Sequence, residues 1–214
     1  MIGITQPRRV AAVNLAERVS WEMHQPKVGQ GLVGYRVRFD EKLSHSTKIK
    51  FLTDGMLLRE AIVDNKLSQY SMLVLDEAHE RTVNSDVLMA LIKDIVKARS
   101  NQGNKLKLIV MSATLDLDKF TKYFESDAVV TVKGRTFPIE VYHSIQPQLD
   151  YLTACMKIVL QIILFEEQGN VLVFLPGQEE IDETQKMLVE KISLLKKSMD
   201  CVVLSLYANL PPHE

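Results

Sequence analysis

Two adjacent carboxylates and a nearby imidazole form the most chemically capable group of side chains in this sequence. Asp76, Glu77 and His79 follow an apolar run, Met72–Leu75, that is typical of a buried strand in a parallel sheet. The carboxyl ends of such strands face the crevice in which α/β proteins bind ligands. At that edge one carboxylate can hold Mg²⁺ and its neighbour can orient or deprotonate an attacking water, as in nucleotide hydrolysis. An acidic pair that only caps the following helix is the alternative interpretation.

Hydroxyl residues follow a second predicted strand, over residues 106–111. Ser112 and Thr114 can hydrogen-bond the acidic residues and relay the state of a bound nucleotide, although such residues are also common helix caps. A zinc site at His79 is not expected, because no second His or Cys lies nearby at the spacing of zinc ligands.

Basic and polar residues at three predicted strand-to-helix turns could hold phosphates. Arg8 and Arg9 stand where a helix begins, and guanidinium groups beside free helix-terminal N–H groups suit an anion. Thr53 stands in a similar turn, and Gly177 and Gln178 belong to another in the second half of the chain. Neither of the first two turns is expected to read bases, so the expected recognition there is of a nucleic acid backbone and tolerates any sequence. A solvated basic turn or a simple helix cap is the alternative for each.

Strands alternate with helices around these residues, which predicts an α/β fold with a parallel sheet and right-handed crossovers. In the first half, apolar patterns predict strands over residues 2–5, 32–39, 48–52, 72–75 and 106–111. The helices predicted between them cover residues 7–24, 54–64 and 85–99.

A change in composition, punctuated by Gly134 and Pro138, predicts a domain boundary near residue 135. Beyond it, strands are expected over residues 139–143, 170–175 and 201–206, and helices over residues 150–165 and 179–197. This second unit of about 80 residues is thin for an independent α/β domain, so we expect it to be incomplete.

The composition is that of a globular protein whose charge is unevenly distributed. Of the 214 residues 46% are hydrophobic and 25% are charged, and the net charge is −1. Residues 1–134 hold 20 Lys and Arg against 16 Asp and Glu, whereas residues 135–214 hold 6 against 11. A polyanion is therefore expected on the first half. No apolar run is long enough to predict a membrane contact, and Cys155 and Cys201 are expected to be free thiols of a reducing compartment, without a disulfide.

In their order and spacing these motifs resemble those of the DEAH-box RNA helicases of superfamily two, along essentially the full chain. The matching segments are residues 5–9 (motif Ia), 53–60 (motif Ib), 76–81 (motif II, Asp-Glu-Ala-His-Glu-Arg), 112–114 (motif III), 134–138 (the inter-domain segment), 174–181 (motif IV) and 210–212 (ahead of the later motifs). The resemblance implies two RecA-like domains, residues 1–134 and 135–214. ATP and Mg²⁺ would lie between them, and single-stranded RNA or a ribonucleoprotein would lie across both.

The resemblance also implies a role for each matching residue. Asp76 and Glu77 would serve Mg²⁺ and the attacking water. His79 would couple these acids to motif III, where Ser112 and Thr114 would link hydrolysis to strand separation.

Further residues are implied to bind RNA and the nucleotide base. The RNA phosphates would lie on Arg8, Arg9 and Thr53 of the first domain and on Gly177 and Gln178 of motif IV in the second. Arg18 matches the family arginine that stacks on adenine.

Departures from the family pattern limit these expectations. The sequence contains no Gly-x-x-x-x-Gly-Lys-Ser/Thr loop for phosphate and no arginine-finger motif, and Pro176 replaces a hydroxyl residue of motif IV. We therefore expect an internal part of an ATP-dependent RNA helicase, with negligible ATPase activity on its own. A short non-catalytic RNA- or partner-binding module derived from a helicase is the alternative, and a DNA-directed helicase is a weaker third. Family roles in splicing and ribosome assembly imply a nuclear or nucleolar location and protein activators, without choosing a pathway.

Overall fold

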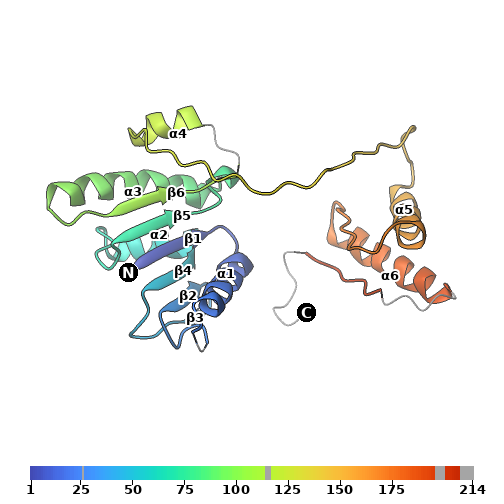
Figure 1. Ribbon diagram of the computed structural model, residues 1–214, viewed down its shortest axis with the longest axis horizontal. Helices are drawn as coiled ribbons and strands as arrows, with labels where there is room; N and C mark the ends of the chain where they lie inside the picture. Colours follow the sequence, from blue (N-terminus) through green and yellow to red (C-terminus); the bar gives the residue numbers. More distant parts are fainter. Residues whose placement is uncertain (26, 114–116, 196–200, 208–214) are drawn as a thin grey trace. The chain divides into compact units, whose positions relative to one another are not determined.

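The computed structural model describes residues 1–25, 27–113, 117–195 and 201–207. The chain divides into two compact units, Met1–Val132 and Lys133–Glu214 (Figure 1). Each unit is described by itself below.

The first unit is built on one sheet of six strands. These are β1 (Ile2–Gln6), β2 (Val33–Val37), β3 (Asp40–Lys42), β4 (Ile49–Thr53), β5 (Met72–Leu75) and β6 (Lys107–Val110). Their order across the sheet is β3-β2-β4-β1-β5-β6, with β3 antiparallel to β2 and the other neighbours parallel. The parallel α/β sheet predicted for the first half is therefore confirmed, and β3 is an added edge strand that the apolar pattern did not indicate because its residues are all exposed.

Helical segments follow β1, β4, β5 and β6 in the chain. They are α1 (Arg9–Glu22), α2 (Asp54–Val63), the short 3₁₀ turn η1 (Ala78–Glu80), α3 (Val83–Asn101) and α4 (Leu117–Phe124). The second unit contains α5 (Tyr151–Phe165) and α6 (Gln178–Leu194).

Apolar side chains cover both faces of the sheet. Adjacent residues of a strand point to opposite faces, and Phe51 and Leu52 of β4 accordingly belong to separate cores. Ala16 of α1 packs in the core of Phe51, whereas Leu57 of α2 and Leu88 of α3 pack in the core of Leu52. Helices therefore shield both sides of the sheet, as parallel strands require, and the arrangement is consistent with a RecA-like α/β fold.

The register of the central strands decides which residues meet at the ligand edge. In β1, Gln6 pairs with Thr53 of β4, and Thr5 pairs with Leu75 of β5. The next residue after β5 is Asp76, so the carboxyl ends of three parallel strands stop at nearly the same level. This level is the edge at which open α/β sheets bind ligands.

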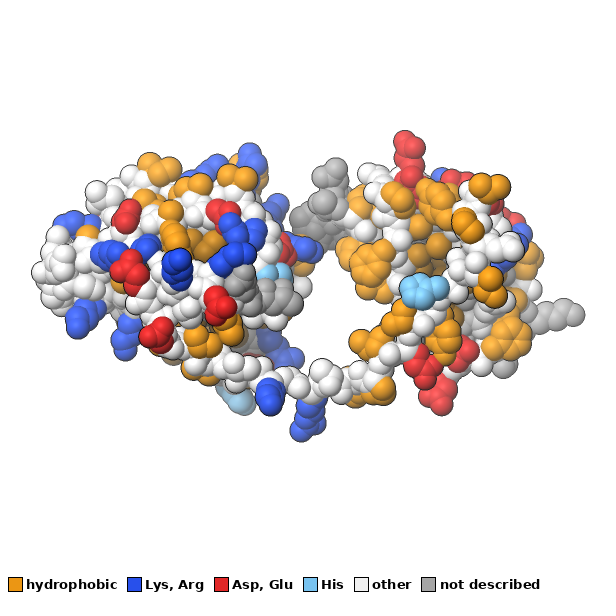
Figure 2. Space-filling view, turned by 90° about the horizontal axis from the view of Figure 1, so that it is seen from above, with side chains coloured by type: hydrophobic (Ala, Val, Ile, Leu, Met, Phe, Trp, Pro, Cys, Tyr) orange, Lys and Arg blue, Asp and Glu red, His pale blue; other side chains and the backbone are white. Residues whose placement is uncertain are grey.

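The second unit differs from the expectation of three strands. Among its described residues α5 and α6 pack through Met156, Val159 and Leu188, and no segment is a strand, so the strands predicted over residues 139–143, 170–175 and 201–206 were wrong. A strand needs a hydrogen-bonding neighbour, and these segments do not pair with one another. Many of their apolar side chains are exposed: Ile139 and Phe174 are 85% and 86% exposed, although Val173 and Val203 pack against the α5–α6 core. Hydrophobic side chains are spread over the visible face of this unit (Figure 2).

Two further features bear on the predicted surroundings of the protein. No helix among the described residues has the length and apolar character needed to cross a membrane. Cys155 and Cys201 are both free cysteines.

Candidate functional site

The candidate site is the loop that follows β5, residues 76–81, which we call the acidic loop. Its first residue, Asp76, is half-buried, and both oxygens of its carboxylate accept hydrogen bonds. Gln6 at the end of β1 donates from Nε2 to Oδ2 over 2.6 Å, and the backbone N–H of Glu77 donates to Oδ1 over 2.8 Å. A carboxylate offers about four lone-pair sites. Asp76 is therefore held in one orientation and keeps acceptor capacity for a further ligand.

The acidic loop is bent tightly at both ends of η1. Glu77 and Arg81 have φ values of +56° and +48°, in the left-handed region that residues other than glycine enter at a cost of about 1–2 kcal/mol. Backbone hydrogen bonds hold this shape: Ala78 N–H donates to the carbonyl of Met111 over 3.1 Å, and Glu80 N–H donates to that of Glu77 over 2.9 Å. The chain thus turns back across the end of β6 and keeps its acidic side chains at the sheet edge.

His79 lies between the acidic pair and the residue after β6. Its Nε2 is 3.3 Å from Oε2 of Glu77, and its Nδ1 is 3.2 Å from Oγ of Ser112. A carboxylate can only accept, so a proton on Nε2 faces Glu77, and the direction of the hydrogen bond between Nδ1 and Ser112 depends on the tautomer of the ring. The structure therefore brings Asp76, Glu77, His79 and Ser112 together, while Thr114 lies outside the described residues.

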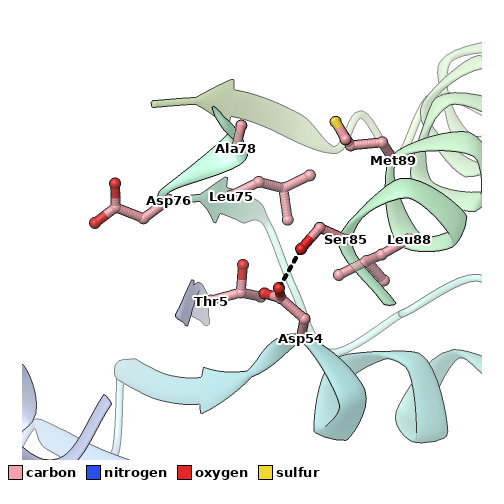
Figure 3. A pocket seen from close by; sticks show the side chains of 8 residues that line it. All are labelled: Thr5, Asp54, Leu75, Asp76, Ala78, Ser85, Leu88 and Met89. Carbon is pink, nitrogen blue, oxygen red and sulfur yellow. Dashed lines mark hydrogen bonds between the residues drawn. The ribbon is translucent and has the colours of Figure 1, made fainter. Parts of the chain in front are cut away.

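A small buried cavity lies under the acidic loop (Figure 3). Its volume is about 10 Å³, room for one water and far too little for a nucleotide. The Ser85 hydroxyl at the start of α3 donates to Oδ2 of the buried Asp54 over 2.5 Å, and the hydroxyl of Thr5 has no partner among the described residues. The carboxylate of Asp76 points away from these groups. Any ligand of Asp76 is therefore bound on the outer side of the loop.

The predicted phosphate-binding residues of the first unit lie at the ends of two strands, with Arg8 and Arg9 after β1 and Thr53 at the end of β4. Arg8 precedes α1 and its Nη2 lies 3.1 Å from Oε1 of Glu80, while Arg9 is exposed on the first turn of the helix. Thr53 ends β4 and precedes α2. Because β1 and β4 end at the same edge as β5, these residues share the edge with the acidic loop.

Among the described residues, the polar contacts of Arg18 are with its own helix and not with the acidic loop. It lies about 14 Å along α1 from Arg9, at 1.5 Å per residue. Its Nε donates to Glu22 over 2.7 Å, and its guanidinium lies 5.1 Å from the ring centroid of the exposed Trp21. An adenine ring would have to share or replace these contacts.

Gly177 and Gln178 belong to the second unit. Gly177 is the residue before α6 and Gln178 is the first residue of the helix. Acidic side chains, Glu179 and Glu180, occupy the first turn beside them, which disfavours a phosphate at this helix end.

The acidic residues at this edge fit one kind of metal. The described residues contain no group of three or more His, Cys, Asp or Glu that could enclose an ion. Mg²⁺ needs no such cage, because it is commonly held by one or two carboxylates, waters and substrate phosphates. Asp76, with its outward carboxylate, and the adjacent Glu77 match that requirement.

Arg81 closes the acidic loop onto α3. It forms a two-pronged pair with Asp86, with Nε–Oδ1 and Nη2–Oδ2 distances of 2.7 Å and 2.9 Å. The hydrogen bond from this guanidinium lowers the pKa of Asp86 below its usual value. The pair orders the exit of the loop and leaves the positive charge of Arg81 partly neutralised.

Gln6 and Glu80 were missed by reasoning from the sequence, although both lie within motifs that it singled out. The missing signal is the register of β1 against β5, which brings the residue after Thr5 next to Asp76. A pattern of residue types along the chain does not contain that register.

Comparison with known proteins gives the same segments a family context. A family model described as DEAD/DEAH box helicase matches residues 4–123. The chain is also 50% identical, over 212 residues, to a Schizosaccharomyces pombe protein named pre-mRNA-splicing factor ATP-dependent RNA helicase prp22. The match covers 99% of this chain and 18% of that relative, so the chain spans less than a fifth of the relative's length.

Proposed function

Because this chain belongs to the DEAD/DEAH box helicase family, we propose that its first unit supplies one wall of an ATP site together with a grip for RNA phosphates. The observation that carries the proposal is the common end of β1, β4 and β5, where Arg8, Thr53 and Asp76 share one sheet edge. A helicase must connect nucleotide chemistry to movement on RNA. Residues that bind RNA and residues that bind the nucleotide follow neighbouring strands at the same sheet edge, so a movement at one group is passed to the other through the strand ends.

At the nucleotide wall, Asp76 and Glu77 would hold Mg²⁺, which when bound to ATP neutralises charge on the transferred phosphate. Glu77 orients the attacking water and takes its proton. His79 is a positioning residue, because it contacts Glu77 on one side and Ser112 on the other. Gln6 holds the Asp76 carboxylate in its outward orientation.

At the RNA wall, Arg8, Arg9 and Thr53 bind phosphates of single-stranded RNA. Because phosphates carry no sequence information, this binding does not depend on the RNA sequence. Gly177 and Gln178 would contribute on the second unit only against the repulsion of Glu179 and Glu180, and Arg18 would stack on the adenine of ATP. In this proposal residues 1–134 and 135–214 are parts of two RecA-like domains.

By itself the 214-residue chain is proposed to hydrolyse ATP negligibly. Its sequence holds no Gly-x-x-x-x-Gly-Lys-Ser/Thr loop, and the lysine of that loop anchors the phosphates during transfer. The sequence also contains no motif that supplies an arginine finger, a residue that raises kcat by a factor of about 10³–10⁵. We propose that the activity to which these residues contribute is ATP-driven remodelling of RNA or ribonucleoprotein during RNA processing. The name of the fission yeast relative, a pre-mRNA-splicing factor, favours splicing and with it a nuclear location.

RNA binding by the purified chain tests the proposal. Fluorescence anisotropy with a labelled single-stranded RNA of about 12 nucleotides measures the Kd at a fixed salt concentration. The double variant Arg8→Gln/Arg9→Gln is expected to weaken binding about tenfold and to lower the slope of log K against log salt concentration by about 1.4. The matched control is Lys105→Gln. Lys105 is exposed and precedes the first residue of β6, at the end of the sheet away from the acidic loop. Equal losses in the control and the double variant would contradict the assigned RNA wall.

A further inference from the structure

Arg8 pairs with a residue of the acidic loop. Its guanidinium pairs with the carboxylate of Glu80 at 3.1 Å. We propose that Glu80 is an internal competitor for Arg8: an RNA phosphate must displace Glu80 to bind Arg8 fully, and the displaced Glu80 releases one anchor of the acidic loop. This inference rests on the proposed function, because it requires Arg8 to be an RNA ligand.

The ion pair is suited to exchange because it is weak and accessible. The side chain of Arg8 is 76% exposed, and that of Glu80 is 26% exposed. Pairs of this kind change an equilibrium constant by a factor of only about 5 or less. A phosphate offers the same guanidinium a charge-assisted, two-pronged partner, so the exchange is favourable once RNA is present.

Two other anchors of the acidic loop, at Asp76 and Ala78, are not open to an anion in this way, whereas the side chain of Arg81 at the loop's exit is 60% exposed but already forms a two-pronged pair with Asp86. Gln6 is 2% exposed and carries no charge, and its bond to Asp76 is shielded from solvent on the donor side. Ala78 is tied to Met111 by backbone atoms. The single-pronged pair of Arg8 with Glu80 is thus a contact that RNA can replace directly, while Asp76 stays fixed by Gln6.

Displacement has a consequence for the nucleotide wall. The amide of Glu80 donates to the carbonyl of Glu77 across η1, and both ends of this turn are in left-handed conformations. Loss of the Glu80 anchor leaves the turn that orients Glu77 and His79 held by its backbone hydrogen bonds and the Arg81–Asp86 pair, and so loosens it. RNA bound at Arg8 is thereby sensed at the residues that position the attacking water.

A double-mutant cycle on RNA affinity tests the competition. The unmutated chain, Glu80→Gln, Arg8→Gln and the double variant are titrated into a labelled single-stranded RNA of about 12 nucleotides at about 0.1 M salt. Glu80→Gln is expected to tighten binding by about 2- to 5-fold in the unmutated chain and to have almost no effect in the Arg8→Gln background.

Removal of any negative charge also helps RNA binding, so a matched control is needed. Glu125→Gln removes a carboxylate that pairs with Lys93 and Lys97 on α3. It is expected to shift the Kd less than Glu80→Gln does. An effect of Glu80→Gln that is equal in both Arg8 backgrounds, or no greater than that of Glu125→Gln, overturns the competition while RNA binding itself stands. Failure of the unmutated chain to bind RNA overturns the proposed function and this inference together.

Hydrogen exchange on the unmutated chain gives a second test that needs no variant. Saturating RNA is expected to speed exchange of the amides of residues 78–81 and to leave those of β5 unchanged. Protected or unaltered amides at η1 with RNA bound would show that the anchor is not released.

Discussion

The bond between Gln6 and Asp76 leads to a prediction about stability that tests the geometry of the site. Gln6→Met replaces a buried amide by an apolar side chain of similar volume, so it adds little cost from packing. It removes the donor that meets Oδ2 of Asp76 at 2.6 Å. A hydrogen bond to a charged group contributes about 1.5–3 kcal/mol. The expected loss in the free energy of unfolding is therefore about 2 kcal/mol.

Urea denaturation of the first unit measures this loss directly. With a urea m-value of about 1–3 kcal/mol/M, 2 kcal/mol corresponds to a shift in midpoint of about 1 M. In an Asp76→Ala background the same Gln6→Met change is expected to cost less than about 1 kcal/mol, because the charged acceptor is gone.

A neighbouring substitution controls for general disturbance of β1. Thr5→Val removes a buried hydroxyl that has no partner among the described residues, so it is expected to change stability by less than about 0.5 kcal/mol. If Gln6→Met costs the same with and without the Asp76 carboxylate, Gln6 does not position Asp76 and the reasoning is refuted.

Three further substitutions probe other charged contacts of the first unit. Glu60→Gln leaves the buried ammonium of Lys50 without its carboxylate partner at 2.9 Å and is expected to cost about 3–5 kcal/mol in urea denaturation. Arg99→Met removes a buried guanidinium that donates hydrogen bonds to backbone carbonyls. The expected loss in the free energy of unfolding is about 2–4 kcal/mol by the same measurement. For Asp86, the hydrogen bond from Arg81 lowers the folded-state pKa, so its stabilising effect is present above the pKa of the unfolded chain and is lost as pH falls through the folded value. The destabilisation by Asp86→Asn at neutral pH should therefore vanish in acid, as followed by thermal melts.

Exposed charged residues provide controls for the substitutions at Glu60 and Arg99. Glu41→Gln removes a carboxylate that is 53% exposed, and Lys97→Met removes an ammonium that is 55% exposed. Each is expected to change stability by less than about 1 kcal/mol. Losses as large as those of Glu60→Gln or Arg99→Met would show that burial does not set the cost.

The first half of the fold could be predicted because its signals are local. Apolar runs, an acidic pair after one of them and helical spacing between them together indicate a parallel sheet with helices. The position of Asp76 at the ligand edge follows from the same pattern, since the acid directly follows β5.

Contacts between segments could not be predicted, because they depend on strand register and pairing. Gln6 meets Asp76 across 70 positions of sequence, and Arg8 meets Glu80 across a similar span. The same limit explains the error in the second unit. Residues 170–175 have the apolar composition of a buried strand, yet composition does not supply the neighbouring strand that would pair with them.

The central claim is that the outer side of the acidic loop is the metal-facing wall of an ATP site, and paramagnetic broadening by Mn²⁺ tests it most directly. Mn²⁺ accepts the same oxygen ligands as Mg²⁺ and broadens the amide signals nearest to it. With ATP and Mn²⁺ added to the isotope-labelled chain, we predict that broadening begins at residues 76–80 and is lost in Asp76→Asn. Broadening that begins elsewhere, or that persists unchanged in Asp76→Asn, would contradict the account.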